Sequence, residues 1–318
     1  MNRKRKSPFI FILLSVVLGY VMPLKSQTRP KEVFNDQAFK ADLKGAVKSQ
    51  LLTVIVDSGL PALRDVGEQA YVLQERYNNN QMRTLEELYN LEKVAIGKSE
   101  ILHDRNGFKT EVLYTDLFED VLNRITYEYD KNGNWKRVTN YDGYYNPLEI
   151  FYYDFTPKNQ ISEIRKTNED GTILERTVFL YDSLGNNVER ITYDKNGVEL
   201  LDTEYLFNQK GNVISYREFD ADQNIREFYE AEFSGDTTLV STTIEIYNDK
   251  KPAASVKYEF DPLGNILKRT DKDLTGTKPD QVRTFIYEWD LNGNWTKQVI
   301  LQDGKERVAA TREITYYQ

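Results

Sequence analysis

The chain offers few residues with the chemistry of a catalytic or ligand-binding site. It has a single histidine, His103, and no cysteine, which excludes a histidine-rich metal site and thiol chemistry. Its three tryptophans, Trp135, Trp289 and Trp295, offer aromatic faces on which a sugar ring can stack. Fifty acids could supply a carboxylate pair for glycoside hydrolysis, but the sequence selects no particular pair. We therefore assign no catalytic, cofactor-binding or metal-binding residue, and we expect no cofactor.

The sequence contains no complete calcium-binding loop. The stretch from Asp220 to Asn224 is similar to the start of a calcium loop, but Ile225 stands where such a loop needs glycine. The bidentate glutamate at the end of the loop is missing as well. Asp130, Asp261 and Asp290 could contact calcium, but ordinary turn chemistry explains them. His103, beside a turn, is best explained as a solvent-facing turn residue.

A repeat organises most of the chain. The position of Asp130 recurs every 24 to 29 residues, which indicates a repeat array with a period of about 27. The equivalent residues are Asp154, Asp182, Asn208, Ser234, Asp261 and Asp290. An aromatic residue precedes the marker in every copy, and most copies have another aromatic residue two positions earlier. Residues i and i+2 of a strand point to one face, so these positions form an aromatic ladder.

The turn that follows the marker has a clear pattern. In most copies glycine stands three residues after the marker and asparagine follows it, as in Gly133-Asn134. Glycine adopts positive φ without a Cβ clash, and the marker aspartate can accept hydrogen bonds from the turn amides. This hairpin would place Tyr129 opposite Trp135. A second turn half a period later gives two strands per repeat, or some fourteen strands in the array.

The same alignment bears on the tryptophans. Trp289 occupies the position of Tyr129, and Trp135 and Trp295 occupy the position of Val213. We therefore favour a role for them in the core ladder, with a sugar-stacking platform as the alternative.

The fold class expected is mainly β, an antiparallel β-hairpin array in a curled or spiral meander sheet over residues 94–318. A flat sheet would leave the aromatic ladder in water, so we expect the sheet to curl around it. Lining by residues 60–93 is the alternative.

The N-terminal region divides into three parts. Residues 1–26, with a basic start and an apolar run, have the pattern of a signal peptide, and an uncleaved anchor is the alternative. Residues 27–41 are expected to be a linker. Residues 42–93 are expected to hold a first strand, ending in the β-branched run 51–56, and a partly helical insertion.

Two patterns support the helices of that insertion. Pro61 marks a start for a helix that runs to Tyr77, and Thr84 to Glu87 have the spacing of a capping box for a helix to about Lys93. For 42–56 a helical face is the alternative to the strand.

Charge limits the partners. The leader carries five cations and no acids, so its removal takes the net charge from −8 to −13. Such a chain is a poor match for nucleic acid or for an anionic membrane surface. No membrane span is expected after the leader is cleaved.

At the repeat residues the chain resembles the YD-repeat (RHS-repeat) family, as a short exported member. The family pattern, Tyr-x-Tyr-Asp-x-x-Gly-Asn and then an apolar residue, is matched well at 127–135 and 287–295. It is matched loosely at 179–188, 205–213 and 258–266 and fails at 231–239. The resemblance implies a hairpin array that wraps into a spiral or shell. Large relatives enclose toxic C-terminal domains, and some members are described as carbohydrate-binding.

These patterns predict an exported protein of the periplasm, cell surface or extracellular space. We expect a non-enzymatic binding module for a glycan or an envelope protein. The alternatives are a polysaccharide-acting hydrolase with unidentified carboxylates and a structural, shell-like protein beside a neighbouring gene product. The binding surface is expected where the copies differ, in residues 60–93, around 231–239, or on the outward strand face.

Overall fold

The computed structural model describes residues 43–56 and 71–318, and every regular element in them is a β-strand. The first ten strands are β1 (Val47–Val56), β2 (Tyr71–Tyr77), β3 (Arg83–Tyr89), β4 (Ala95–His103), β5 (Lys109–Asp116), β6 (Val121–Tyr129), β7 (Trp135–Asp142), β8 (Pro147–Phe155), β9 (Ile161–Thr167) and β10 (Ile173–Tyr181). The others are β11 (Asn187–Asp194), β12 (Glu199–Phe207), β13 (Val213–Asp220), β14 (Ile225–Ser234), β15 (Thr238–Asn248), β16 (Lys251–Phe260), β17 (Ile266–Asp273), β18 (Gln281–Trp289), β19 (Trp295–Gln302) and β20 (Lys305–Tyr316). Within these ranges no helix is present that could span a membrane.

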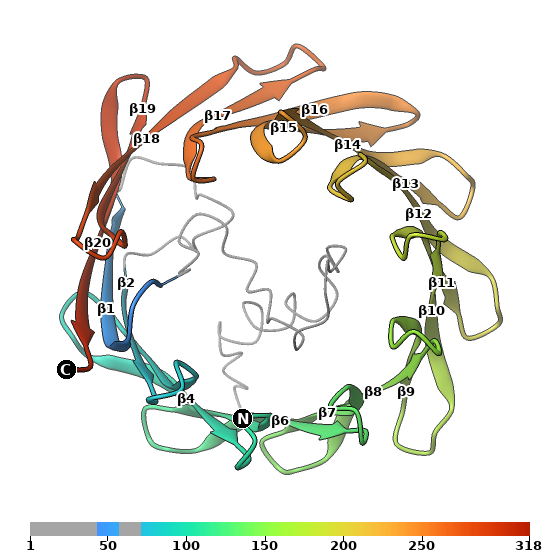
Figure 1. The fold of residues 1–318 in the computed structure, drawn as a ribbon, viewed down its shortest axis with the longest axis horizontal. Coiled ribbons are helices and arrows are strands. Elements are labelled where there is room, and N and C mark those ends of the chain that lie inside the picture. Colours follow the sequence, from blue (N-terminus) through green and yellow to red (C-terminus); the bar gives the residue numbers. More distant parts are fainter. Residues whose placement is uncertain (1–42, 57–70) are drawn as a thin grey trace, which may run out of the picture.

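The sheet is a closed antiparallel barrel of 20 strands (Figure 1). Consecutive strands pair around the ring, and β1 pairs with both β2 and β20. Val54, for example, lies opposite Tyr71 on one side and Ala310 on the other. The expected antiparallel hairpins are confirmed, and so is the first strand, because 51–56 lies within β1. The spiral is wrong: pairing through β1 leaves the sheet without a free edge.

The expected helical insertion is also wrong where the structure describes it. Residues 71–77 form β2, and the capping-box sequence from Thr84 lies in β3. Residues 57–70, which hold the rest of the first predicted helix, lie outside the described residues. The helical spacing was misleading because pairing with β1 and β4 outweighs local helical preference.

The predicted turn chemistry is confirmed. Oδ1 of Asp130 accepts the backbone N–H groups of Asn132 at 2.8 Å and Asn134 at 2.9 Å, and Gly133 has φ of 83°. Tyr129 lies opposite Trp135, as expected. At one and two repeat lengths before Asp130, the same main-chain turn occurs at 104–108 and at 78–82. The first residues of these turns, Asn78 and Asp104, precede Asp130 by 52 and 26 residues. The hairpin repeat therefore extends back to β2.

The aromatic positions share one face of the sheet, here called the ladder face. The Trp135 ring lies 6.0 Å from that of Tyr127 and 5.6 Å from that of Tyr153. Trp295 is buried in the core formed where β1 meets β17–β20. The core prediction holds less well for Trp289, which ends β18 beside a turn and is exposed.

Candidate functional site

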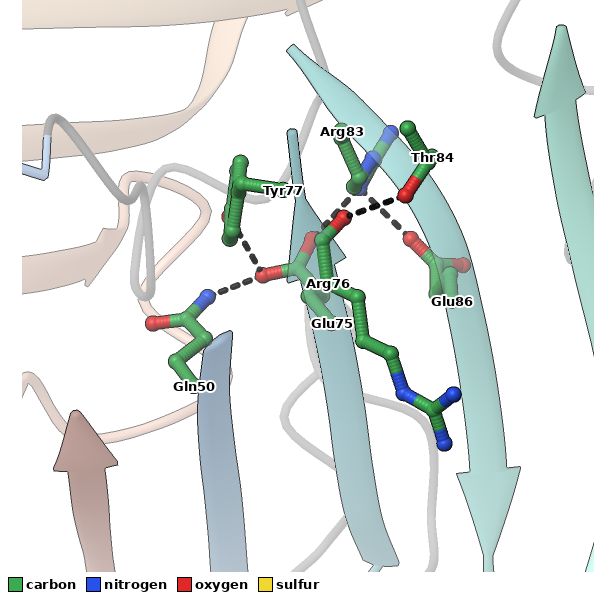
Figure 2. Close-up of polar contacts among 7 residues, drawn as sticks. All are labelled: Gln50, Glu75, Arg76, Tyr77, Arg83, Thr84 and Glu86. Carbon is green, nitrogen blue, oxygen red and sulfur yellow. Dashed lines mark hydrogen bonds and ion pairs between the residues drawn. The ribbon is translucent and has the colours of Figure 1, made fainter. Parts of the chain in front are cut away.

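A network of charged side chains lies where the barrel closes, across β1, β2 and β3 (Figure 2). One guanidinium nitrogen of Arg83 lies 2.6 Å from Oε1 of Glu75 and 2.6 Å from Oε2 of Glu86. The other oxygen of Glu75 accepts hydrogen bonds from the Gln50 amide and, at 3.0 Å, from the Tyr77 hydroxyl. We call these five residues the closure network.

Strand register explains why these residues meet. Glu75 lies directly opposite Gln50 on β1 and Glu86 on β3, so all three side chains are on the ladder face. Two carboxylates in opposite positions repel each other. Arg83 sits between them and compensates that repulsion, and its side chain is only 16% exposed.

Burial and charge shift the pKa values of this network. Burial raises the pKa of Glu86, and burial together with the negative charge of Glu75 raises the pKa of Tyr77. Burial opposes the charge of Arg83, but the carboxylates of Glu86 and Glu75 outweigh it and raise its pKa. Nearby on β20, burial lowers the pKa of Arg312 to about 10, and its guanidinium lies 3.4 Å from the centre of the Trp295 ring.

A pair of carboxylates is also the equipment of a glycosidase. Here, however, Arg83 binds both Glu75 and Glu86, and Glu75 is largely inaccessible to a substrate. The arrangement fits the closure of the barrel better than acid–base chemistry. No local sequence pattern indicates this network, because it depends on the pairing of β2 with β3, whose sequences predict helices.

A second charge, the half-buried Lys109, lies in the aromatic ladder. It stands five residues after Asp104, the position that Trp135 occupies after Asp130. Its ammonium nitrogen lies 4.5 Å from the centre of the Tyr127 ring, and burial lowers its pKa to about 7. The signal that could have found it was a lysine at a position that is apolar in most copies.

Aromatic side chains also project into solvent at one end of the barrel. Phe118 is 75% exposed on the turn between β5 and β6, and Tyr144 is 87% exposed on the turn between β7 and β8. Leu117 and Tyr145 beside them are also exposed. We call these four residues the rim patch. Arg124 lies below it, with its guanidinium 5.4 Å from the centre of the Tyr145 ring.

A shallow groove opens at the opposite end of the barrel. Its volume is about 730 Å³, and it lies between the β6–β7 and β8–β9 turns. Asp130, Asn132, Asp154 and Asn159 contribute its polar lining. The carboxylate of Asp130 is already occupied by its own turn, so it is not free to bind a ligand.

The other sequence candidates have ordinary surroundings. Oδ1 of Asp220 accepts the backbone N–H of Asn224 at 2.8 Å, so the calcium-like stretch is a hairpin turn. In the described part of the chain, no three acidic, histidine or cysteine side chains are grouped so as to hold a metal ion. His103 is half-buried at the end of β4, where burial lowers its pKa, so it is less exposed than expected.

No family model and no curated protein matches the sequence. Among solved structures, a porin-like protein from Bacteroides uniformis is 12% identical over 86% of this chain and 99% of its own, with a TM-score of 0.38. TcdB2-TccC3 without its hypervariable C-terminal region is 11% identical over 75% of this chain and 15% of its own, with a TM-score of 0.33. Hsv2 of Kluyveromyces lactis is 9% identical, with coverages of 85% and 99% and a TM-score of 0.27. Similarity at this level assigns no function.

Proposed function

We propose that the chain is an exported envelope protein, a short member of the YD-repeat family, that binds a glycan without catalysis. The observation that carries the proposal is the exposure of Phe118 and Tyr144 on neighbouring turns of one rim. Large aromatic side chains that face water together mark interaction surfaces more often than isolated apolar residues do. The signal-peptide pattern of residues 1–26 supports export.

The rim patch suits a sugar for two reasons. Its rings offer flat apolar faces, and the exposed carboxylates of Glu119 and Asp120 can accept hydrogen bonds from hydroxyl groups. The net charge of the mature chain disfavours anionic surfaces, whereas a neutral glycan meets no repulsion.

The turn backbone that carries the patch is also held in place before a ligand arrives. The backbone N–H groups of Phe118 and Tyr144 each donate to the carboxylate of the aspartate that begins their turn, at 2.8 Å in both cases. A backbone fixed in advance loses little conformational entropy on binding.

A glycan array probed with the purified chain tests the proposal, followed by calorimetry on each glycan that is retained. We expect Phe118→Ala and Tyr144→Ala to weaken binding by about tenfold or more, as loss of a stacking ring should. Leu184→Ala is the matched control, because Leu184 is equally exposed on a turn at the opposite rim. An array without any retained glycan, or an equal loss in the control, would overturn the proposal.

A further inference from the structure

A second surface lies on the face of the sheet opposite the ladder face. There β11 and β12 carry an acidic group made of Glu189, Glu199, Asp202 and Glu204. Glu189 and Glu204 lie directly opposite each other, an arrangement that repels. Unlike Glu75 and Glu86, they have no arginine between them: neither forms an ion pair within the described part of the chain.

Asp202 is the centre of this group. It is only 9% exposed, and its neighbours across the two adjoining strands are the apolar residues Ile191 and Phe219. Its Oδ1 accepts no hydrogen bond from any residue in 43–56 or 71–318. Against the larger effect of burial, the backbone N–H of Thr203 favours the charged form of the carboxylate and lowers its pKa, but Oδ1 itself has no donor among the described residues. A buried carboxylate oxygen without a donor is costly, so one acceptor remains that the chain does not itself satisfy.

The surrounding charges leave the group acidic. Glu199 accepts a hydrogen bond from the side-chain amide of Gln223 at 2.6 Å, a neutral donor. The nearest cation by register is Arg217, opposite Glu204 on β13, and its guanidinium lies over the ring of Phe228. On β11 the group also has Tyr193 beside it, and Arg176 of β10 lies over the Tyr193 ring, with its guanidinium 4.9 Å from the ring centre. Burial, followed by the charges of Glu189, Glu199 and Glu204, raises the pKa of Asp202 to about 6.

We propose that Asp202, Glu189 and Glu204 form a binding site for an organic cation, an ammonium or guanidinium group. Such a group supplies several N–H donors spread over a few ångströms, which suits carboxylates on neighbouring strands. A bare metal ion does not suit them, because the described residues offer no group of three ligands with metal-binding geometry. The cation can come from a free polyamine or from a lysine or arginine of a partner protein.

Titration calorimetry on the purified chain at pH 7.5 tests this site with two probes, spermidine and a lysine-rich decapeptide. We expect at least one probe to bind, and Asp202→Asn to weaken it about tenfold or more. Glu128→Gln is the matched control, because Glu128 is an acid on the same face that already pairs with Arg137 at 3.0 Å. Binding of spermidine would identify a free amine as sufficient, and binding of the peptide alone would identify a protein segment.

The pH dependence gives a second readout. Only the ionised carboxylates attract a cation, so affinity should fall several-fold between pH 7.5 and pH 5. Absence of binding by both probes, equal weakening in Glu128→Gln, or affinity that does not change with pH would each overturn the site. Its failure is separable from that of the glycan proposal, because the rim patch shares no residue with it.

Discussion

Asn134 secures Asp130 with two groups at once. Its backbone N–H donates to Oδ1 of Asp130 at 2.9 Å, and its side-chain amide donates to Oδ2 at 3.0 Å. The same double contact recurs in four other turns, between Asp142 and Asn146, Asp182 and Asn186, Asp220 and Asn224, and Asp261 and Asn265. This contact explains the asparagine that follows the turn glycine at positions 134, 186 and 265. The side-chain amides of Asn212 and Asn294 donate elsewhere, to the carbonyl of Asp236 and to the carbonyl of Lys44.

Loss of this contact should weaken the barrel. We expect Asp130→Ala to lower the free energy of unfolding by about 1–2 kcal/mol, because two turn amides and one side-chain amide lose their acceptor. Urea denaturation measures the change. Asp222→Ala, at an exposed turn acid whose side chain secures no turn, is the control and should change little. Equal midpoints for the two variants would contradict the role given to Asp130.

Backbone strain in the turns should be removable. Lys93 occupies the position of the turn glycine and has φ of 61°, a conformation that costs an L-residue energy. We expect Lys93→Gly to raise the free energy of unfolding by about 0.5–1 kcal/mol. The reverse change, Gly171→Ala, should cost about 1 kcal/mol, because Gly171 has φ of 83° and no neighbour within 4 Å of an added Cβ. Thermal unfolding of both variants tests whether Lys93→Gly stabilises the chain and Gly171→Ala destabilises it. A lower unfolding temperature for Lys93→Gly would exclude backbone strain at Lys93.

The sequence predicted the contacts between residues that are close together in the chain. It did not predict the contacts between residues that are far apart. A turn such as Asp130–Asn134 is made by residues at most four positions apart, so its chemistry can be read directly. The closure of the barrel pairs Val54 with Ala310, and no local sequence pattern predicts that contact. The same limit hid the closure network, since Glu75 and Glu86 meet only after β2 and β3 have paired.

The turn at Asn78 is local, but the sequence did not predict it as a hairpin turn. The turn at Asn78 lacks both the aspartate and the glycine of the pattern, and Gln81 adopts the positive φ that glycine usually takes. Its sequence therefore looked like the end of a helix. The constant spacing of 26 residues to Asp104 and then to Asp130 was the signal that could have identified it.

The closure network should be sensitive to the loss of its cation. Arg83→Met would leave Glu75 and Glu86 facing each other in a largely buried site, at a cost of about 3–5 kcal/mol. The double variant Arg83→Met, Glu86→Gln removes one of the two charges and should recover part of that loss. Urea denaturation gives both values. Arg137→Met, which breaks a more exposed pair with Glu128, is the control and should cost less than about 1 kcal/mol.

The stability of the double variant shows whether carboxylate repulsion or lost packing causes the effect of Arg83→Met. If Glu86→Gln restores nothing, the effect of Arg83→Met comes from lost packing of the arginine side chain. The repulsion between the two carboxylates would then be a minor part of the energetics.

Lys109 should make stability rise with pH. Its pKa is about 7 in the folded chain and about 10.4 when unfolded, so between these values the unfolded chain binds more protons. The free energy of unfolding therefore increases from pH 7 towards pH 10. We expect Lys109→Met to stabilise the chain by about 2 kcal/mol at pH 6.5, with a smaller gain at pH 9.5. The contact with Tyr127 limits the gain, and a gain that does not change with pH would contradict a buried ammonium.

Asp202 should show the opposite dependence. Its pKa is about 6 in the folded chain and about 3.9 when unfolded, so between pH 4 and pH 6 the folded chain holds a proton that the unfolded chain has lost. Stability therefore falls as pH rises through this window and stays low above it. We expect Asp202→Asn to raise the free energy of unfolding by about 2 kcal/mol at pH 7.5 and by little at pH 4, measured by urea denaturation at both values. If Asp202→Asn destabilises the chain at pH 7.5, the carboxylate has a partner within the fold, and the site proposed for an organic cation loses its basis.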